Sequence, residues 1–305
     1  MPHVAINSSA LSDIGLKRHD NQDSYLNDSG LYLVADGMGG GVSGRAASAT
    51  ALSCLGRLAN TSIRSRSMIE SCIQEAQQQV LGIGETKNSV AGTTLTGLIL
   101  KDTKIDDALG DSWYVVNIGD SRTYHANGSP DGGWDVTSFS QLTRDHSQRQ
   151  RVIDSGRMLP EAAERLVPRN IITRAIGSPD GVRPDFFKAD LTGRFVICSD
   201  GVYSMLTQEQ MAALSTLDLP ADDVAHRLIE AALDAGGDDN ATVVVVDVTE
   251  AGGDAEPGFH STGAAPSGAD QEWEAARLSE TEDIDSMDDS TLENLRMQTA
   301  ARDQD

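Results

Sequence analysis

The stretch LYLVADGMGG, residues 31–40, contains a short apolar run that stops at an Asp-Gly pair. Val, Leu and aromatic residues bounded by Gly and Asp are typical of β-strands. Five more stretches have this character, at residues 93–100, 113–118, 123–125, 194–198 and 242–248. We predict a strand at each, with 123–125 as a hairpin partner of 113–118.

Helical patterns occur between these strands. Ala-rich composition or apolar residues at helical spacing predict helices at residues 44–58, 67–80, 148–156 and 222–235. The strands and helices do not alternate, which argues against a doubly wound parallel sheet and favours an α+β sandwich of antiparallel sheets. Residues 157–190 lack periodicity, and we expect a surface flap there.

The charge of the chain is strongly acidic and unevenly distributed. The 305 residues carry a net charge of −23, and residues 250–305 hold 15 acidic but three basic side chains. This argues against nucleic acid and anionic membranes as partners, because phosphates attract Lys and Arg. We predict a catalytic domain at 1–249 and a disordered acidic tail at 250–305, with a flexible linker at 250–270. The tail either docks a partner or only keeps the protein soluble.

Three further observations concern location. No apolar run approaches the roughly 20 residues of a membrane helix. The first residues resemble no secretory leader, and the three cysteines show no disulfide or zinc spacing. We therefore expect a cytoplasmic protein that does not bind membranes.

Aspartates stand at the ends of four predicted strands, each before Gly, Ser or Asn: Asp36, Asp120, Asp200 and Asp239. Strand ends can direct side chains to one point, where clustered carboxylates need cations. Oxygen ligands favour Mg²⁺, Mn²⁺ or Ca²⁺, and two such ions can activate a water and hold a phosphoryl group. Solvated turns are the alternative explanation for each pair, and spacing alone does not decide between them.

Eight segments in order carry a resemblance to a known family. They are GLKRHDNQD (15–23), VADGMGG (34–40), GTT (92–94), NIGDSR (117–122), LTRDHS (142–147), TRAIG (173–177), CSDGV (198–202) and DNAT (239–242). Together they resemble the metal-dependent serine/threonine protein phosphatases of type 2C, in their bacterial form.

The resemblance implies two packed antiparallel sheets flanked by helices, a four-layer α-β-β-α fold. It implies that Asp36 bridges two Mn²⁺ or Mg²⁺ ions, with the Gly37 carbonyl on one of them. It implies that Asp200 and Asp239 complete the shell of the other ion. Asp120 with Asp200 would bind a third.

The resemblance also implies the activity. A metal-bridged water would hydrolyse phosphoserine and phosphothreonine in proteins, opposing a bacterial Ser/Thr kinase. Arg18 would hold the substrate phosphate, and Asp23 would act from behind the metal ligands. We expect a monomer whose partners are phosphorylated proteins and a cognate kinase with its substrates. The alternative, a catalytically attenuated phosphoprotein-binding regulator with this fold, would require loss of the metal aspartates, and all four remain.

Some positions depart from the family pattern. Gln22 stands where many members carry Glu, so a metal contact there would be through an amide or a water. Gly41 and Arg45 replace a His and a Glu that are common in bacterial members, and the acid that protonates the leaving group is unassigned. We expect His146 to be structural and Cys198 to be a buried strand residue.

Overall fold

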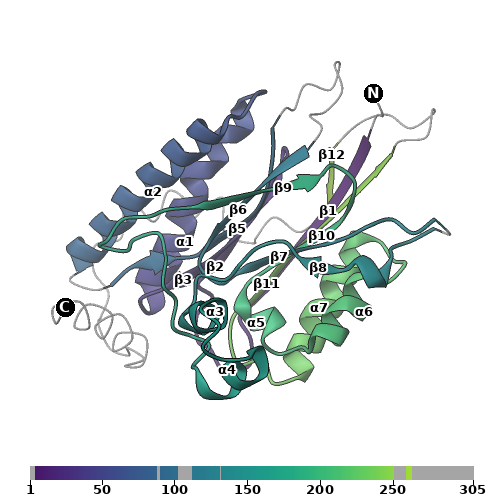
Figure 1. The fold of residues 1–305 in the computed structure, drawn as a ribbon. Coiled ribbons are helices and arrows are strands. Elements are labelled where there is room, and N and C mark those ends of the chain that lie inside the picture. Colours follow the sequence, from purple (N-terminus) through teal and green to yellow (C-terminus); the bar gives the residue numbers. More distant parts are fainter. Residues whose placement is uncertain (1–3, 88–89, 102–111, 131, 251–258, 263–305) are drawn as a thin grey trace.

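The computed structural model describes residues 4–87, 90–101, 112–130, 132–250 and 259–262 of the chain. Two β-sheets pack face to face between two groups of helices (Figure 1). Each sheet combines strands from distant parts of the chain.

The first sheet has its strands in the order β12 (Phe259–Thr262), β1 (Val4–Asp13), β11 (Ala241–Glu250), β10 (Gly193–Cys198), β7 (Arg122–Ala126) and β8 (Ser140–Gln141). The second has the order β2 (Asp23–Asp28), β3 (Leu31–Met38), β5 (Leu95–Leu100), β6 (Ser112–Ile118) and β9 (Asp185–Asp190), and β4 (Gly92–Thr93) pairs with β3. Every pairing is antiparallel except that of β12 with β1.

The helices cover the outer faces of the sheets. The long helices α1 (Gly41–Gly56) and α2 (Arg66–Lys87) lie on the second sheet, while α5 (Asp200–Tyr203), α6 (Gln208–Ser215) and α7 (Ala221–Asp234) lie on the first (Figure 1). Helices α3 (Gln148–Asp154) and α4 (Pro160–Leu166) contact each other at one end of the sandwich, and short 3-10 turns occur at Arg57–Asn60 and Val136–Ser138.

Three apolar layers hold these elements together. Leu33 packs with α1 and α2, whereas its neighbour Val34 faces the layer between the sheets, because successive strand residues point to opposite faces. Trp113 and Phe195 meet edge to face in that central layer, with ring centroids 6.2 Å apart. Leu228 of α7 packs in the third layer, beneath the first sheet. The predicted four-layer α-β-β-α fold is therefore confirmed.

Three local predictions were wrong. Strand β7 is no hairpin partner of β6, because the chain crosses from one sheet to the other between them. The expected flap at 157–190 instead contains α4 and β9, and β9 pairs with β6 at the edge of a sheet. Residues 259–262, expected in a linker, form β12; the rest of the expected tail beyond Glu250 lies outside the described residues.

Within the part of the chain that the structure describes, no helix combines the length and the apolar character that crossing a bilayer requires.

Candidate metal-dependent active site

The aspartates singled out in the sequence come from both sheets. Asp36 lies in β3 directly opposite Asp23, the first residue of β2. Asp120 follows β6 at the point where the chain changes sheets, and Asp200 begins α5 directly after β10. Asp239 precedes β11. These positions place five carboxylates at one edge of the sandwich.

The pKa values show that these carboxylates affect one another. Burial, followed by the charges of Asp23, Asp200, Asp239 and Asp120, raises the pKa of Asp36 well above its usual value. Burial and the charge of Asp200 do the same to the pKa of Asp120. The structure thus brings together all of the aspartates that the sequence placed in the site.

Two of these acids have pKa values near neutrality. Burial raises the pKa of Asp23 to about 7, although a hydrogen bond from Ser199 opposes the rise. Burial and then the charge of Asp239 raise the pKa of Asp200 to about 6. Bringing such groups together in ionised form is costly unless a cation balances them.

The donor set fits a hard divalent cation. The Oδ1 atoms of Asp23 and Asp200 are buried without a hydrogen-bond partner, and carboxylate oxygens are the ligands that Mg²⁺ and Mn²⁺ favour. Among the described residues, no three His, Cys, Asp or Glu side chains stand at ligand spacing. Asp239 Oδ2 binds Arg18 instead, at 2.8 Å.

Gly37 can bring only its backbone to the site. A Cβ atom there would lie 2.1 Å from the Gly44 carbonyl oxygen and 2.6 Å from that of Gln22. When its amide is oriented to satisfy its neighbours, the Gln22 side chain donates to the Gly37 carbonyl over 3.2 Å and accepts from the Gly41 N–H over 3.1 Å. Gln22 therefore contacts the carbonyl expected to face a metal.

Arg18 lies in the 14–22 loop at the rim of the site, half-exposed and paired with Asp239. Arg45 braces the same loop, because its guanidinium binds Asp20 at 2.7 Å and donates to the Asn21 carbonyl over 3.1 Å. The rim thus has cationic groups beside the buried carboxylates.

Sequence reasoning missed two groups of residues around the site. Ser199 donates to Asp23 Oδ2 over 2.7 Å and accepts from the Thr242 N–H over 3.0 Å, which fixes the Asp23 carboxylate. Both residues lie within recognised motifs, CSDGV and DNAT, and that was the available signal. Arg169, whose charge opposes the rise in the pKa of Asp200, comes from the 157–190 region and had no local signal.

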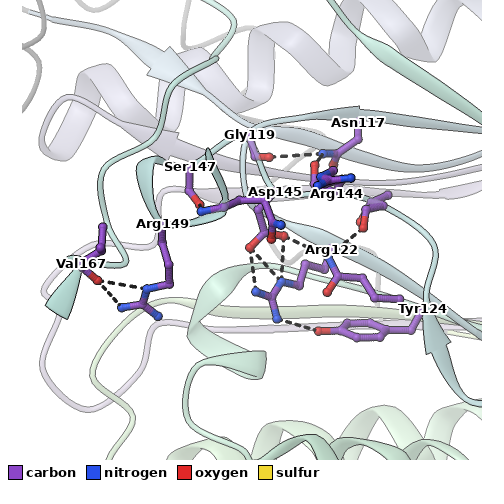
Figure 2. Close-up of polar contacts among 12 residues, drawn as sticks. Asn117, Gly119, Arg122, Tyr124, Arg144, Asp145, Ser147, Arg149 and Val167 are labelled. Carbon is purple, nitrogen blue, oxygen red and sulfur yellow. Dashed lines mark hydrogen bonds and ion pairs between the residues drawn. The ribbon is translucent and has the colours of Figure 1, made fainter. Parts of the chain in front are cut away.

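The turn that carries Asp120 is held from behind by residues 143–147. The Gly119 N–H donates to His146 Nδ1 over 3.2 Å, and the His146 N–H donates to the Gly119 carbonyl over 2.8 Å. Arg122 binds Asp145 through Nε and Nη2 at 2.9 and 2.7 Å (Figure 2). Burial lowers the pKa of His146. Its ring is buried and bonds to the Gly119 N–H and to Asp185, which matches the structural role expected of it.

Comparisons with known proteins agree with this architecture. The family model of protein phosphatase 2C matches residues 7–241. Protein phosphatase PhpP of Streptococcus pneumoniae is 33% identical over 242 residues, which cover 75% of this chain and 92% of PhpP.

Solved structures agree as well. The catalytic domain of the serine/threonine phosphatase PstP, in complex with two manganese ions, superposes with a TM-score of 0.67 at 30% identity, covering 81% of this chain and 99% of that one. The phosphatase MsPP of Mycobacterium smegmatis, in complex with cacodylate, gives a TM-score of 0.67 at 34% identity, covering 79% and 97%.

The chain belongs to the protein phosphatase 2C family, the metal-dependent serine/threonine protein phosphatases. The predicted family and enzyme class are confirmed.

Proposed function

We propose that this chain hydrolyses phosphoserine and phosphothreonine in proteins with the help of two or three Mn²⁺ or Mg²⁺ ions. The observation that carries the proposal is the group of five acids at one edge of the sandwich, with two buried oxygen atoms that lack partners. A site for divalent ions explains both features, because the ions would stabilise the ionised acids and bind the Asp200 oxygen, and water held by the ions would bond to the Asp23 oxygen.

The residue roles follow from position. Asp36, the Gly37 carbonyl, Asp200 and Asp239 would hold two ions, and Asp120 with Asp200 a third. When bound, such ions supply an activated water and neutralise charge on the phosphoryl group. Thiol chemistry is not supported, because burial raises the pKa of Cys198 to about 12.

Two residues of this chain would serve the substrate and the ligands directly. Arg18 would bind the phosphate oxygens, since a guanidinium fork matches them and the side chain lies at the rim. Asp23, held by Ser199 opposite Asp36, would orient water or a ligand from behind.

The substrates would be phosphorylated proteins, among them a bacterial Ser/Thr kinase and its targets. The support is family membership together with relatives that are named as bacterial serine/threonine phosphatases.

A chelation experiment tests the function. We expect the full chain to hydrolyse p-nitrophenyl phosphate and a phosphothreonine peptide with Mn²⁺, to stop in excess EDTA and to recover when Mn²⁺ is restored. Asp36→Asn should lower kcat by roughly a thousandfold or more while the fold persists, because ion-mediated stabilisation amounts to several kcal/mol.

Asp28→Asn is the matched control, since Asp28 is the exposed residue at the other end of β2; its activity should equal that of the wild type. Unchanged turnover in EDTA would contradict the metal mechanism. Binding of the phosphopeptide without turnover would support the attenuated regulator instead.

A further inference from the structure

One buried amide bonds to both ends of the loop that carries Arg18. Asn240 is 5% exposed. Its Nδ2 donates to the carbonyl oxygens of Ile14 and Asp20, each over 2.9 Å, and its Oδ1 accepts from the Gln22 N–H over 2.9 Å. Both amide donors and the oxygen are therefore used on backbone groups at the two ends of residues 14–22.

The inner side of this loop rests on the chain just before Asn240. The Leu16 N–H donates to the Gly237 carbonyl over 2.8 Å. Gly15 has a φ of +79°, and a Cβ on it would lie 2.2 Å from the Asp239 carbonyl oxygen. The loop can lie this close only because Gly15 has no side chain and accepts a left-handed conformation.

The same short segment also holds a carboxylate of the site. Asp239 Oδ1 accepts from the Asn240 N–H over 2.8 Å, while its Oδ2 binds Arg18 over 2.8 Å. Residues 239 and 240 thus fix both the backbone of the loop and the acid beside which the guanidinium rests.

We propose that Asn240 is the positioning residue for phosphate binding by Arg18, an inference that rests on the proposed function. Asn240 sets the two ends of the loop, and the loop sets where the Arg18 guanidinium stands relative to the carboxylates. Phosphate recognition by a planar fork depends on such geometry, so displacement of the loop weakens binding without removing the charge.

Removing the amide has a specific consequence. In Asn240→Ala, three backbone groups lose their partner and the ends of the loop are released. The contacts of β3 that hold Asp36 and Gly37 remain. We therefore expect weaker binding of substrate and phosphate, with a much smaller change in the Mn²⁺ concentration needed for half-maximal activity.

The test measures KM for p-nitrophenyl phosphate, the inhibition constant of inorganic phosphate and the Mn²⁺ concentration for half-maximal activity. Asn240→Ala should raise KM and the inhibition constant of phosphate about tenfold or more. This is the range expected when Arg18 loses a hydrogen bond to the charged phosphate. The Mn²⁺ midpoint should stay within about threefold of the wild type, and Asn240→Ser, which keeps one donor, should be intermediate.

A double-variant cycle separates positioning from general destabilisation. Arg18→Ala should itself weaken phosphate binding, and adding Asn240→Ala should weaken it little further, because the group being positioned is gone. Asn117→Ala is the matched control. It removes another buried amide that donates to two carbonyls, those of Gly119 and Arg144, but on the Asp120 side (Figure 2). It should leave the phosphate constant within about twofold, since it does not contact the loop.

The outcomes are distinguishable. A wild-type chain without Mn²⁺-dependent turnover would overturn the proposed function. An active wild type, with a phosphate constant unchanged in Asn240→Ala and Asn240→Ser, would overturn the positioning role alone. Full additivity with Arg18→Ala would overturn it too. If Asn240→Ala does not fold, Asn240→Ser supplies the same comparison.

Discussion

The acidic side chains at the two ends of strand β11 differ in how completely their charge is compensated. Near the end of the strand, Asp247 accepts two hydrogen bonds, at 2.6 and 2.7 Å, from the buried guanidinium of Arg194. The other N–H groups of Arg194 donate to the Ser215, Leu217 and Leu219 carbonyls over 3.3, 2.8 and 2.6 Å. At this end of the strand, the Arg194 guanidinium balances the charge of Asp247, and the N–H donors of Arg194 all have acceptors.

Before the start of the strand, Asp239 belongs to a group of acids that the fold leaves incompletely compensated. Arg18 reaches Asp239 from the rim, but buried oxygens of Asp23 and Asp200 lack partners. Buried charge thus has two roles in one molecule. The Arg194–Asp247 pair holds the chain after α6 against the sheet, whereas the acidic edge offers the divalent ions that we propose a set of uncompensated carboxylates.

Removing the Arg194–Asp247 pair should have the largest effect on stability. Arg194→Met leaves Asp247 buried without its partner, and we expect the free energy of unfolding to fall by about 3–5 kcal/mol. Urea denaturation measures this change. Arg194→Met with Asp247→Leu should recover part of the loss, because no charge then remains buried.

The surface pair of Arg66 and Glu70, four residues apart on α2, provides the control. Its loss through Arg66→Met should cost no more than about 1 kcal/mol, because exposed ion pairs are screened by water. Equal losses at the two positions would contradict the distinction between buried and exposed pairs.

The acids near the start of β11 should make the free energy of unfolding depend on pH. The folded-state pKa values of Asp23 and Asp200, about 7 and about 6, lie above the 3.8 of an unperturbed aspartate. Their contribution to stability is therefore fully present below about pH 4 and is lost progressively as pH rises to about 6 for Asp200 and about 7 for Asp23. In EDTA, the unfolding free energy from these groups should fall across that window.

Saturating Mn²⁺ should reduce this fall, because the ion stabilises the ionised acids. Asp23→Asn should also reduce it in EDTA, by removing one of the titrating groups. A profile in EDTA that rises between pH 4 and 7, unaltered by Asp23→Asn, would contradict the account.

The smallest effect is expected from the acidic tail. Deleting residues 251–305 removes β12 from the edge of β1 and should cost about 1 kcal/mol, since few backbone hydrogen bonds are lost. The kcat for p-nitrophenyl phosphate and the Mn²⁺ midpoint should match those of the full chain. A large drop in kcat would show that the tail contributes to the site.

Sequence patterns found the apolar strands but not the polar ones. Strands β3, β10 and β11 are nearly continuous apolar runs, whereas β1 carries Ser8 and Ser9 in buried positions, and the hydroxyl of Ser9 bonds to Asp222 over 2.9 Å. A polar residue that finds its partner 213 positions away leaves no local hydrophobic signal. Strand β9 was missed because it is a half-buried edge strand.

Some residues of the candidate site could likewise be predicted from the sequence, and others could not. The aspartates could be predicted because their residue types and the motifs around them are local properties of the chain. The roles of Ser199 and Asn240 could not, because their partners Asp23 and Ile14 lie 176 and 226 positions away.

The candidate ligands and the types of the main elements could be read from the sequence alone. Oxygen ligands, strand composition and helical spacing are all carried by short segments. Only the tertiary structure decided which strands share a sheet, which acid at either end of β11 has a buried cation, and how one amide fixes the Arg18 loop. Those properties depend on contacts between distant segments, and their energies arise only when packing excludes water and brings the partners together.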